Sequence, residues 1–408
     1  MLRPSHWARP LAGAVIHGPG CSAESLLATF AEQIRARGWR VGGLIQRTRR
    51  DATGRKIAME LTELDSGRVV SIGQALGSGA GGDACAVDPS AVADSTAALR
   101  RAIAARVDLL VINKWSVLEQ AGGGLADEML AAMVEGLPVL TSVQAALLPD
   151  WMNFVGGRCR LLDMDSSALW QWWGRSRLYQ DLAQDVGEGM ALRVVVGQNF
   201  TLVEGPHGVG LAGTPPHTAP GCRPAPDAGR YAGRPLRELA GLVDSWNPTE
   251  LAIGLAAIGA YTNRYDLAGD PGNGLDALPC DGQVVVIGGF PGIHDRLPGC
   301  HVIERAPDDG EYPAEAAEWL LPACETAVIT ASTLANRSLP RLLELAERAR
   351  VALVGPSTAL CPRLFDHGIE VLSGLIATDP DGLARVIAEG GAARDARRYG
   401  RQVTLRRE

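Results

Sequence analysis

The chain has 408 residues, which at roughly 150 residues per domain is enough for two or three domains with their own cores. Hydrophobic residues make up 46% and charged residues 21%, which excludes extensive disorder. The formal net charge is −7 without any long basic run, which argues against nucleic acid or an anionic membrane as the main partner. We therefore expect small molecules, metal ligands or proteins as partners, a second copy of the chain included.

No apolar stretch reaches the ~20 residues that a membrane-spanning helix needs, and the apolar run 11–16 is too short for the core of a signal peptide. We expect a soluble, cytoplasmic protein with no membrane insertion. The eight cysteines include no CxxC pair, and neighbouring cysteines are at least 20 residues apart. This spacing fits neither a zinc ribbon nor a disulfide scaffold, so we expect reduced thiols.

Residues 1–175 alternate short apolar runs with helical patterns, which is typical of a sheet covered by helices. The segment 151–173 is rich in Trp, and we interpret these residues as packing of a terminal helix or of a domain interface. The expected strands are 11–16, 41–46, 109–112 and 138–142, and the expected helices are 25–37, 91–106 and one that begins at Asp127.

Residues 190–280 follow a polar connector near 176–188 and predict a small α+β domain. It should contain strands 192–196 and 200–203, a Pro-rich loop over 214–229, and helices over 236–243 and 248–261. Asn247 caps the second helix, Pro248 occupies its first position and Glu250 completes a capping box.

Residues 281–408 repeat a strand–helix pattern and predict a Rossmann-like, doubly wound parallel sheet. The fold class is therefore α/β, with the small α+β domain between two α/β modules. The expected strands are 284–287, 301–303, 327–330, 351–354 and 371–372, and the expected helices are 314–321, 338–348, 361–367 and 381–389.

The segment 18–25 follows the first strand and opens a helix, where a phosphate loop of pattern GxxxxGK[ST] would stand. Gly18 and Ser25 match that pattern, but Glu24 occupies the position of the phosphate-binding Lys. The strand 109–112 ends in Asn113 where such enzymes keep an Mg²⁺-linked acid. A degenerate, non-hydrolysing loop is expected, although Glu24 could equally be an ordinary first-turn acid.

Lys114 follows that strand, at the carboxyl end where α/β proteins bind ligands. It is one of only two lysines in an Arg-rich chain. We expect Ser25 and Lys114 to form an anion site, and a solvated loop lysine is the alternative.

Several strings in this half resemble an uncharacterised bacterial family related to P-loop nucleoside triphosphatases and often encoded beside molybdate-transport genes. The resemblance covers about 1–160 and implies a binding or regulatory module more than a hydrolase. The strings are Leu76-Gly77, Cys85 to Pro89, Asn113 to Trp115, Gly122 to Gly124 and Gly136 to Val143.

In the last sheet, small and polar residues follow the strand ends, so they should surround one crevice. A turn-forming role for these residue types is the alternative. The predicted ligand-binding residues are Gly288, Gly289, Phe290, Pro291, Glu304, Thr330, Ser332, Thr333, Asn336, Gly355, Pro356 and Ser357.

Glu304 lies 16 residues after Gly288, near the position where dinucleotide folds keep an acid for a ribose hydroxyl. It is also the candidate metal ligand. Cys300 and His301, with His294 nearby, offer a second metal hypothesis. Successive strand residues point to opposite faces, however, so a buried thiol beside a surface histidine is the alternative.

The ordered motifs of the second half resemble the heavy-metal chelation domain family. They include Val196-Gly197, Gly208 to Ala212, Ile253 to Ile258 with Asn263, and the strand-end residues above. The resemblance covers about 190–400 and implies a domain like the enolase N-terminal domain, a Rossmann-like domain, and a site between them that includes Asn263. The chain departs from the family at Gly259, where the family has Asn, which puts one polar contact in doubt.

The sequence thus favours a cytoplasmic protein that binds, chelates or otherwise handles a metal or its oxyanion, with a link to molybdenum. The cofactor could be a heavy metal, molybdate or a nucleoside-type molecule. One alternative is an enzyme that uses a nucleotide or an S-adenosylmethionine-like cofactor in the crevice. The other is a regulatory partner of a metal transporter or metalloenzyme, without catalysis. No nucleophile, triad or metal-ligand set in the sequence identifies a reaction.

Overall fold

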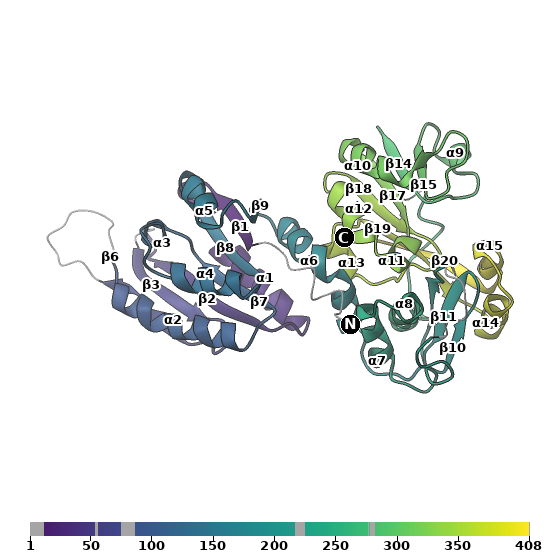
Figure 1. Ribbon diagram of the computed structural model, residues 1–408, viewed down its shortest axis with the longest axis horizontal. Helices are drawn as coiled ribbons and strands as arrows, with labels where there is room; N and C mark the ends of the chain where they lie inside the picture. The colour runs from purple at the N-terminus through teal and green to yellow at the C-terminus, as the bar shows by residue number, and fades with distance from the viewer. Residues whose placement is uncertain are drawn as a thin grey trace. The chain divides into compact units, whose positions relative to one another are not determined.

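The structure is a computed structural model that describes residues 12–53, 56–74, 86–216, 225–275, 277 and 282–407. The chain divides into two compact units (Figure 1). The N-terminal unit ends at Trp173, and the C-terminal unit begins at Gly174. Each unit is a mixed α/β structure, which confirms the predicted fold class. The strings at Leu76, Gly77 and Cys85, and the middle of the Pro-rich loop, lie outside the described residues.

The N-terminal unit contains a seven-stranded sheet of order β4-β3-β2-β7-β8-β1-β9. Its five strands from β2 to β9 run parallel, and β3 and β4 extend the β2 edge in antiparallel fashion. These two strands were not predicted. The strands are β1 (Ala12–His17), β2 (Val41–Arg50), β3 (Lys56–Glu63), β4 (Val69–Ser71), β7 (Leu109–Asn113), β8 (Val139–Gln144) and β9 (Cys159–Leu162), and β5 (Gly73–Gln74) pairs with β6 (Ala86–Val87) beside them.

Two apolar clusters cover the two faces of this sheet. The successive residues Ala14 and Val15 of β1 point to opposite faces, and they belong to different clusters. Trp151 packs edge-on to Trp115, with ring centroids 5.3 Å apart, in one of them. Trp173 packs edge-on to Trp39 in the other. The helices are α1 (Glu24–Ala36), α2 (Pro89–Ala104), α3 (Val117–Gln120), α4 (Ala126–Val134) and α5 (Leu148–Phe154). The Trp-rich segment therefore builds cores, as predicted.

Helix α6 (Ser166–Gln184) continues through residues 176–184, where the sequence predicted a polar connector. Beyond Gly174, the side chains of Leu178, Tyr179 and Leu182 are buried in the main core of the C-terminal unit. The prediction was wrong because polar residues alternate with these apolar ones at helical spacing, which makes the segment amphipathic.

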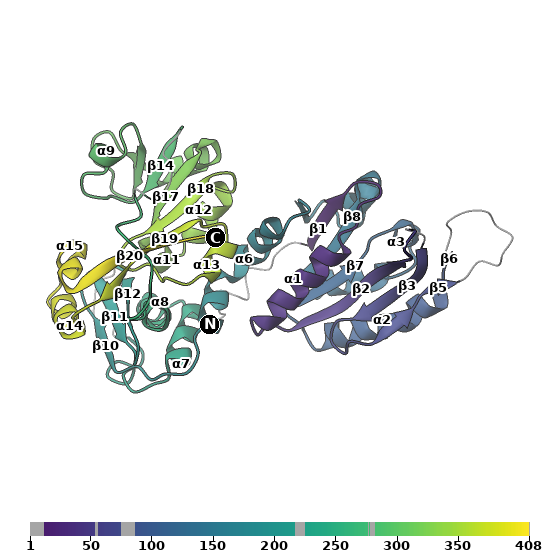
Figure 2. The ribbon, with the colours of Figure 1, turned by 180° about the vertical axis from the view of Figure 1, so that it is seen from behind.

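The C-terminal unit begins with a small α+β domain. Strands β10 (Arg193–Val196), β11 (Phe200–Glu204) and β12 (Val209–Gly213) form an antiparallel meander. The side chain of Asn247 caps α8 (Pro248–Thr262) by accepting hydrogen bonds from two backbone N–H groups, which confirms the predicted N-cap. Glu250 does not complete the predicted capping box, because its carboxylate accepts from the Ser245 hydroxyl while the Asn247 N–H donates to Ser245. Helix α7 (Leu236–Ala240) precedes it, and α8 lies against β11 and β12 (Figures 1 and 2).

An eight-stranded sheet of order β13-β20-β19-β18-β17-β14-β15-β16 forms the second domain of this unit. The strands from β19 to β16 are parallel, whereas β20 runs antiparallel to β19 and pairs in antiparallel fashion with β13 at this edge. The predicted doubly wound parallel sheet therefore carries an antiparallel strand near one edge. The strands are β13 (Asp270–Pro271), β14 (Val284–Ile287), β15 (His301–Glu304), β16 (Tyr312–Pro313), β17 (Thr326–Thr330), β18 (Arg350–Val354), β19 (Val371–Ala377) and β20 (Gly400–Arg406).

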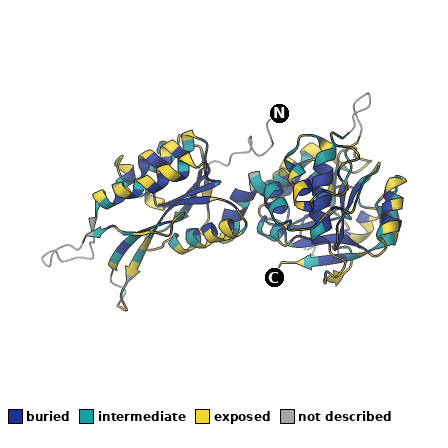
Figure 3. Ribbon diagram, turned by 90° about the horizontal axis from the view of Figure 1, so that it is seen from below, coloured by how far each residue is buried: buried dark blue, intermediate teal, exposed yellow. Residues whose placement is uncertain are grey.

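Helices follow the strands of this second sheet, as the sequence predicted. They are α9 (Ile293–Arg296), α10 (Ala317–Leu320), α11 (Ser332–Ala335), α12 (Leu339–Leu345), α13 (Arg363–Asp366), α14 (Pro380–Ala388) and α15 (Ala393–Ala396). Buried residues concentrate in the sheets and on the inward faces of the helices (Figure 3). Among the helices that the structure describes, none has both the length and the apolar character needed to cross a membrane.

Candidate functional site

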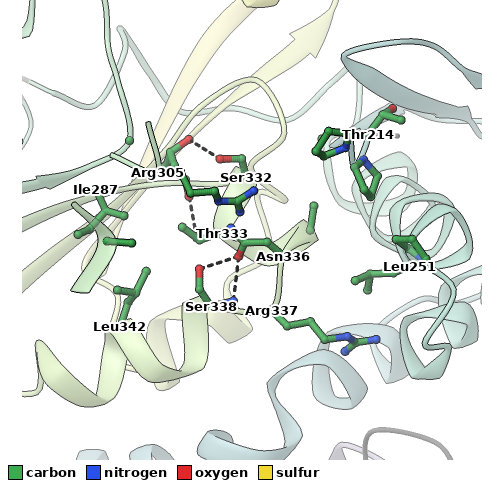
Figure 4. A pocket seen from close by; sticks show the side chains of 18 of the residues that line it. Thr214, Leu251, Ile287, Arg305, Ser332, Thr333, Asn336, Arg337, Ser338 and Leu342 are labelled. Atoms are coloured by element: carbon green, nitrogen blue, oxygen red, sulfur yellow. Dashed lines mark hydrogen bonds between the residues drawn. The ribbon is translucent and has the colours of Figure 1, made fainter. Parts of the chain in front are cut away.

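A cleft of about 720 Å³ lies in the C-terminal unit, at the carboxyl ends of β14, β15 and β17 (Figure 4). Its opposite wall comes from the small domain, through residues that follow β12 and residues at the start of α8. The volume falls within the range of roughly 300–1,000 Å³ that small-molecule sites occupy. The fold thus places one ligand-sized cleft where strand ends of a doubly wound sheet usually bind ligands.

Half of the predicted crevice residues meet in this cleft: Gly288, Glu304, Thr330, Ser332, Thr333 and Asn336. Gly288 has a φ of +100°, and a Cβ there would lie 2.5 Å from Cγ2 of Thr330. Only glycine can adopt this backbone without strain and leave room for Thr330. The Thr330 side chain can therefore occupy its position at the end of β17 only because residue 288 is a glycine.

Hydrogen bonds order the polar wall of the cleft. The Thr333 hydroxyl donates to the Thr330 carbonyl at 2.7 Å, and the hydroxyls of Thr330 and Ser332 lie 3.2 Å apart. Oδ1 of Asn336 accepts from both the backbone N–H and the hydroxyl of Ser338. Toward the described residues, the Asn336 NH₂ group makes no hydrogen bond, so it is available as a donor to a ligand (Figure 4).

Among the described residues that line this cleft, Glu304 is the single carboxylate. Its oxygens accept hydrogen bonds from the backbone N–H groups of Gly289, at 3.4 Å, and of Arg305, at 2.8 Å. The Arg305 side chain is exposed and also lines the cleft. A carboxylate and a guanidinium group at the end of β15 therefore both line the cleft.

Arg337 holds the two walls of the cleft together. Its Nη2 donates to the backbone carbonyls of Val243 and Ser245, at 2.6 and 2.8 Å. Its guanidinium carbon lies 5.0 Å from the ring centroid of Tyr179 and 5.5 Å from that of Trp246. Burial lowers the pKa of Arg337 and raises that of Tyr179. Neither cleft arginine was predicted from the sequence, because no local pattern shows which carbonyls or rings a guanidinium will meet.

The other predicted crevice residues do not line this cleft. Phe290 packs against an apolar cluster on the sheet, and Ser357 lines a separate cavity of about 10 Å³. The remaining four lie in turns beside the strand ends: Gly289, Pro291, Gly355 and Pro356. Their role as turn formers is the alternative that the sequence analysis left open.

Asn263 lies at the end of α8, is 1% exposed and stands outside the cleft lining. Its NH₂ group donates to the carbonyls of Thr358 and Leu375, and its Oδ1 accepts from the N–H of Leu360. All of its strong hydrogen-bonding groups are thus used to join α8 to the second domain. The implied ligand contact is replaced by a structural one.

Gly259, where the family has Asn, sits at the closest approach between α8 and β12. A Cβ at Gly259 would lie 2.8 Å from the Cα of Gly210, and a Cβ at Gly210 would lie 2.0 Å from the Ala256 carbonyl oxygen. The departure from the family therefore removes a side chain at a point where the two backbones touch.

The second metal hypothesis concerned Cys300, His301 and His294. Sγ of Cys300 lies 3.7 Å from Nδ1 of His294, whereas the His301 ring packs edge-on to Tyr312. Cys300 is buried and His294 is exposed. Across the residues described in the structure, no group of three or more His, Cys, Asp or Glu side chains is arranged to hold a metal ion.

In the N-terminal unit, β8 separates β1 from β7, so Ser25 and Lys114 follow strands that are not neighbours. Glu24 accepts hydrogen bonds from the N–H and hydroxyl of Thr48 on β2. Asn113 is 1% exposed and accepts from the Ser142 hydroxyl at 2.7 Å. Glu24 and Asn113, which stand where a phosphate loop has its charged groups, thus each form a hydrogen bond to a residue of another secondary-structure element.

The C-terminal unit is thus a pair of domains, one α+β and one with a doubly wound, mostly parallel sheet, and a ligand-sized cleft lies between them. Residues 179–262 and 274–406 match two family models, DUF4213 and DUF364, both described as "Putative heavy-metal chelation". A DUF364 protein of unknown function from Desulfitobacterium hafniense, known from its crystal structure, is 32% identical. It has a TM-score of 0.52, and the match covers 57% of this chain and 98% of that one. The C-terminal unit therefore belongs to the DUF364 heavy-metal chelation family.

A second crystal structure of a DUF364 protein, from Pyrococcus horikoshii, is 20% identical with a TM-score of 0.50 and shares the fold; the match covers 57% of this chain and 99% of that one. Residues 12–172 match the model of DUF2478, a protein family of unknown function. Over 160 residues the chain is 41% identical to the molybdenum import ATP-binding protein ModC 2 of Bradyrhizobium diazoefficiens. The match covers 39% of this chain and spans only 18% of that relative.

Proposed function

We propose that the protein handles a metal or a metal oxyanion, and that the C-terminal cleft is where this cargo binds. The observation that carries the proposal is the cleft of about 720 Å³, which lies within the part of the chain that matches the heavy-metal chelation models. Hydroxyl and amide groups at Thr330, Ser332 and Asn336 provide the hydrogen bonds that an oxygen-rich ligand needs.

The link to molybdenum comes from the N-terminal unit. Its similarity to a molybdenum import protein supports a role near molybdate uptake or use. The side chains of Ser25 and Lys114 would provide an anion site at the carboxyl edge of its sheet. Calorimetric titration of the full chain with molybdate tests this, because unchanged binding by Lys114→Ala would contradict a role for that lysine.

This unit should not hydrolyse nucleoside triphosphates. Phosphoryl transfer relies on a cation at the β and γ phosphates and on an acid that holds Mg²⁺, and Glu24 and Asn113 occupy those positions. We expect no ATP or GTP turnover above background in a coupled phosphate assay. Steady turnover that disappears in Ser25→Ala would contradict this expectation.

A nucleoside-type cofactor in the cleft is the second candidate, and the position of Glu304 favours it. This carboxylate ends the second strand of the Rossmann-like sheet, after a glycine loop, as the ribose-binding acid of dinucleotide folds does. In that case the protein would be an enzyme, or would be regulated by a nucleotide.

Titration of wild type and Glu304→Gln with a metal panel, molybdate, nucleotides and S-adenosylmethionine separates the two candidates. If a nucleoside binds, the change should weaken it by about 1.5–3 kcal/mol through loss of charged hydrogen bonds. If a cation binds directly, loss of the single carboxylate should abolish measurable metal binding. Absence of binding by every ligand would favour a non-catalytic regulatory partner.

A further inference from the structure

The charges that line the cleft do not fit a bare metal cation. Its single carboxylate, Glu304, already accepts two backbone hydrogen bonds, and the guanidinium groups of Arg305 and Arg337 line the same space. Metal sites in proteins normally collect three or more His, Cys, Asp or Glu ligands, and no such group occurs among the residues that the structure describes. The net formal charge of the lining is positive, which favours an anion.

Arg305, rather than Arg337, is available to bind that anion. Arg337 already donates to the Val243 and Ser245 carbonyls and faces two aromatic rings. Arg305 is exposed, and its guanidinium group forms no ion pair with any residue in the described ranges. A guanidinium group can donate two parallel hydrogen bonds to a carboxylate or a phosphate.

The opposite wall of the cleft suits a flat apolar group. Trp246 lines the cleft with 49% of its surface exposed, which is unusual for so large a ring. The guanidinium carbon of Arg337 lies 5.5 Å from the centroid of this ring, within cation–π distance. Leu251, Ile287 and Leu342 add apolar surface to the lining. An exposed indole ring is a stacking surface for a planar ring of a ligand.

We infer that the cleft binds an anionic organic molecule that contains a planar ring. Its anionic group pairs with Arg305 and its ring packs on Trp246, while Ser332 and Asn336 bind further oxygen atoms. For the metal cargo, this inference rests on the proposed function: the metal enters already held by an organic chelator that carries an anionic group and a planar ring, of which a catecholate is a simple probe. The protein's own side chains then recognise the chelator and do not coordinate the metal.

Calorimetry on the full chain tests this with defined probes: Ni²⁺ alone, molybdate alone, a molybdate–catecholate complex and metal-free 2,3-dihydroxybenzoate. We expect the catecholate complex to bind at least tenfold more tightly than molybdate or Ni²⁺. Arg305→Ala should weaken binding about tenfold to a hundredfold, and Arg305→Lys less. Trp246→Leu, which keeps apolar surface without the flat ring, should weaken it about tenfold. Arg385→Ala, at an exposed arginine of α14, is the matched control and should not change binding.

The outcomes separate this inference from the proposed function. If dihydroxybenzoate binds with the same dependence on Arg305 and the molybdate complex does not, the anionic ring is supported and the metal function fails. Tighter binding of Ni²⁺ or bare molybdate than of the complex overturns the inference. Equal binding by wild type and Arg305→Ala, or no binding of either ring-containing probe, overturns it as well.

Discussion

The packing of α8 on β12 provides a sharp test of the small domain that forms one wall of the cleft. In Gly210→Ala, the new Cβ would lie 2.0 Å from the Ala256 carbonyl oxygen and 2.3 Å from the Ala260 backbone N. Both atoms belong to the backbone of a helix that is buried along nearly its whole length, so no side-chain rotation can relieve the overlap. Overpacking that only displaces side chains costs about 1–3 kcal/mol. Because α8 itself must move, we expect a loss of about 3 kcal/mol or more.

Thermal unfolding of the full chain, followed by circular dichroism, measures this loss. In a unit of this size each kcal/mol lowers Tm by roughly 2–4 °C, so the transition of the C-terminal unit should fall by about 6–12 °C. The transition of the other unit should not move. Gly241→Ala is the control, because Gly241 has a helical φ of −61° and open space around its Cβ. Equal melting of Gly210→Ala and Gly241→Ala would refute the close backbone contact.

Two further predictions concern buried groups of the C-terminal unit. Asp181 is fully buried and lies 3.0 Å from Nε2 of His367 and 3.2 Å from Nη1 of Arg363. Asp181→Ala should lower the free energy of unfolding by about 3–5 kcal/mol, because it leaves the buried His367 and the partly buried Arg363 guanidinium without this carboxylate; a change below about 1 kcal/mol in urea unfolding would contradict this. Burial raises the pKa of Cys324 to about 11, so at pH 8 its thiol should stay protonated and unreactive toward iodoacetamide while exposed Cys21 is alkylated, as mass spectrometry would show. Alkylation of both at equal rates would argue against the buried position of Cys324.

Part of the cleft could be predicted because of how parallel strands converge. Glu304 and Thr330 end the two short apolar strands β15 and β17 on either side of β14, and the carboxyl ends of such parallel strands face one edge of the sheet. Gly288 could be recognised by its position directly after a strand. The sequence could not distinguish residues that face the cleft from those that only turn the chain, as at Pro291 and Gly355, because both roles select the same residue types.

The other wall could not be predicted because it depends on contacts between distant segments. Trp246 and Arg337 are 91 positions apart in the numbering, and neither belongs to a recognisable motif. Asn263 was misplaced for the same reason, since its hydrogen-bond partners are far along the chain. The antiparallel strand β3 did carry a signal: Met59 and Leu61 are buried and alternate with more exposed residues, as in an antiparallel strand with one buried face.

Anomalous scattering at the molybdenum edge tests most directly whether the cleft is the binding site. Crystals of the full chain would be grown with the molybdate–catecholate complex, and an anomalous difference map would locate the metal. We expect a peak inside the cleft between Arg305 and Trp246, with the organic ligand, and not a protein side chain, coordinating the metal. A peak only beside Ser25 and Lys114, or a metal coordinated directly by Glu304, would contradict this assignment.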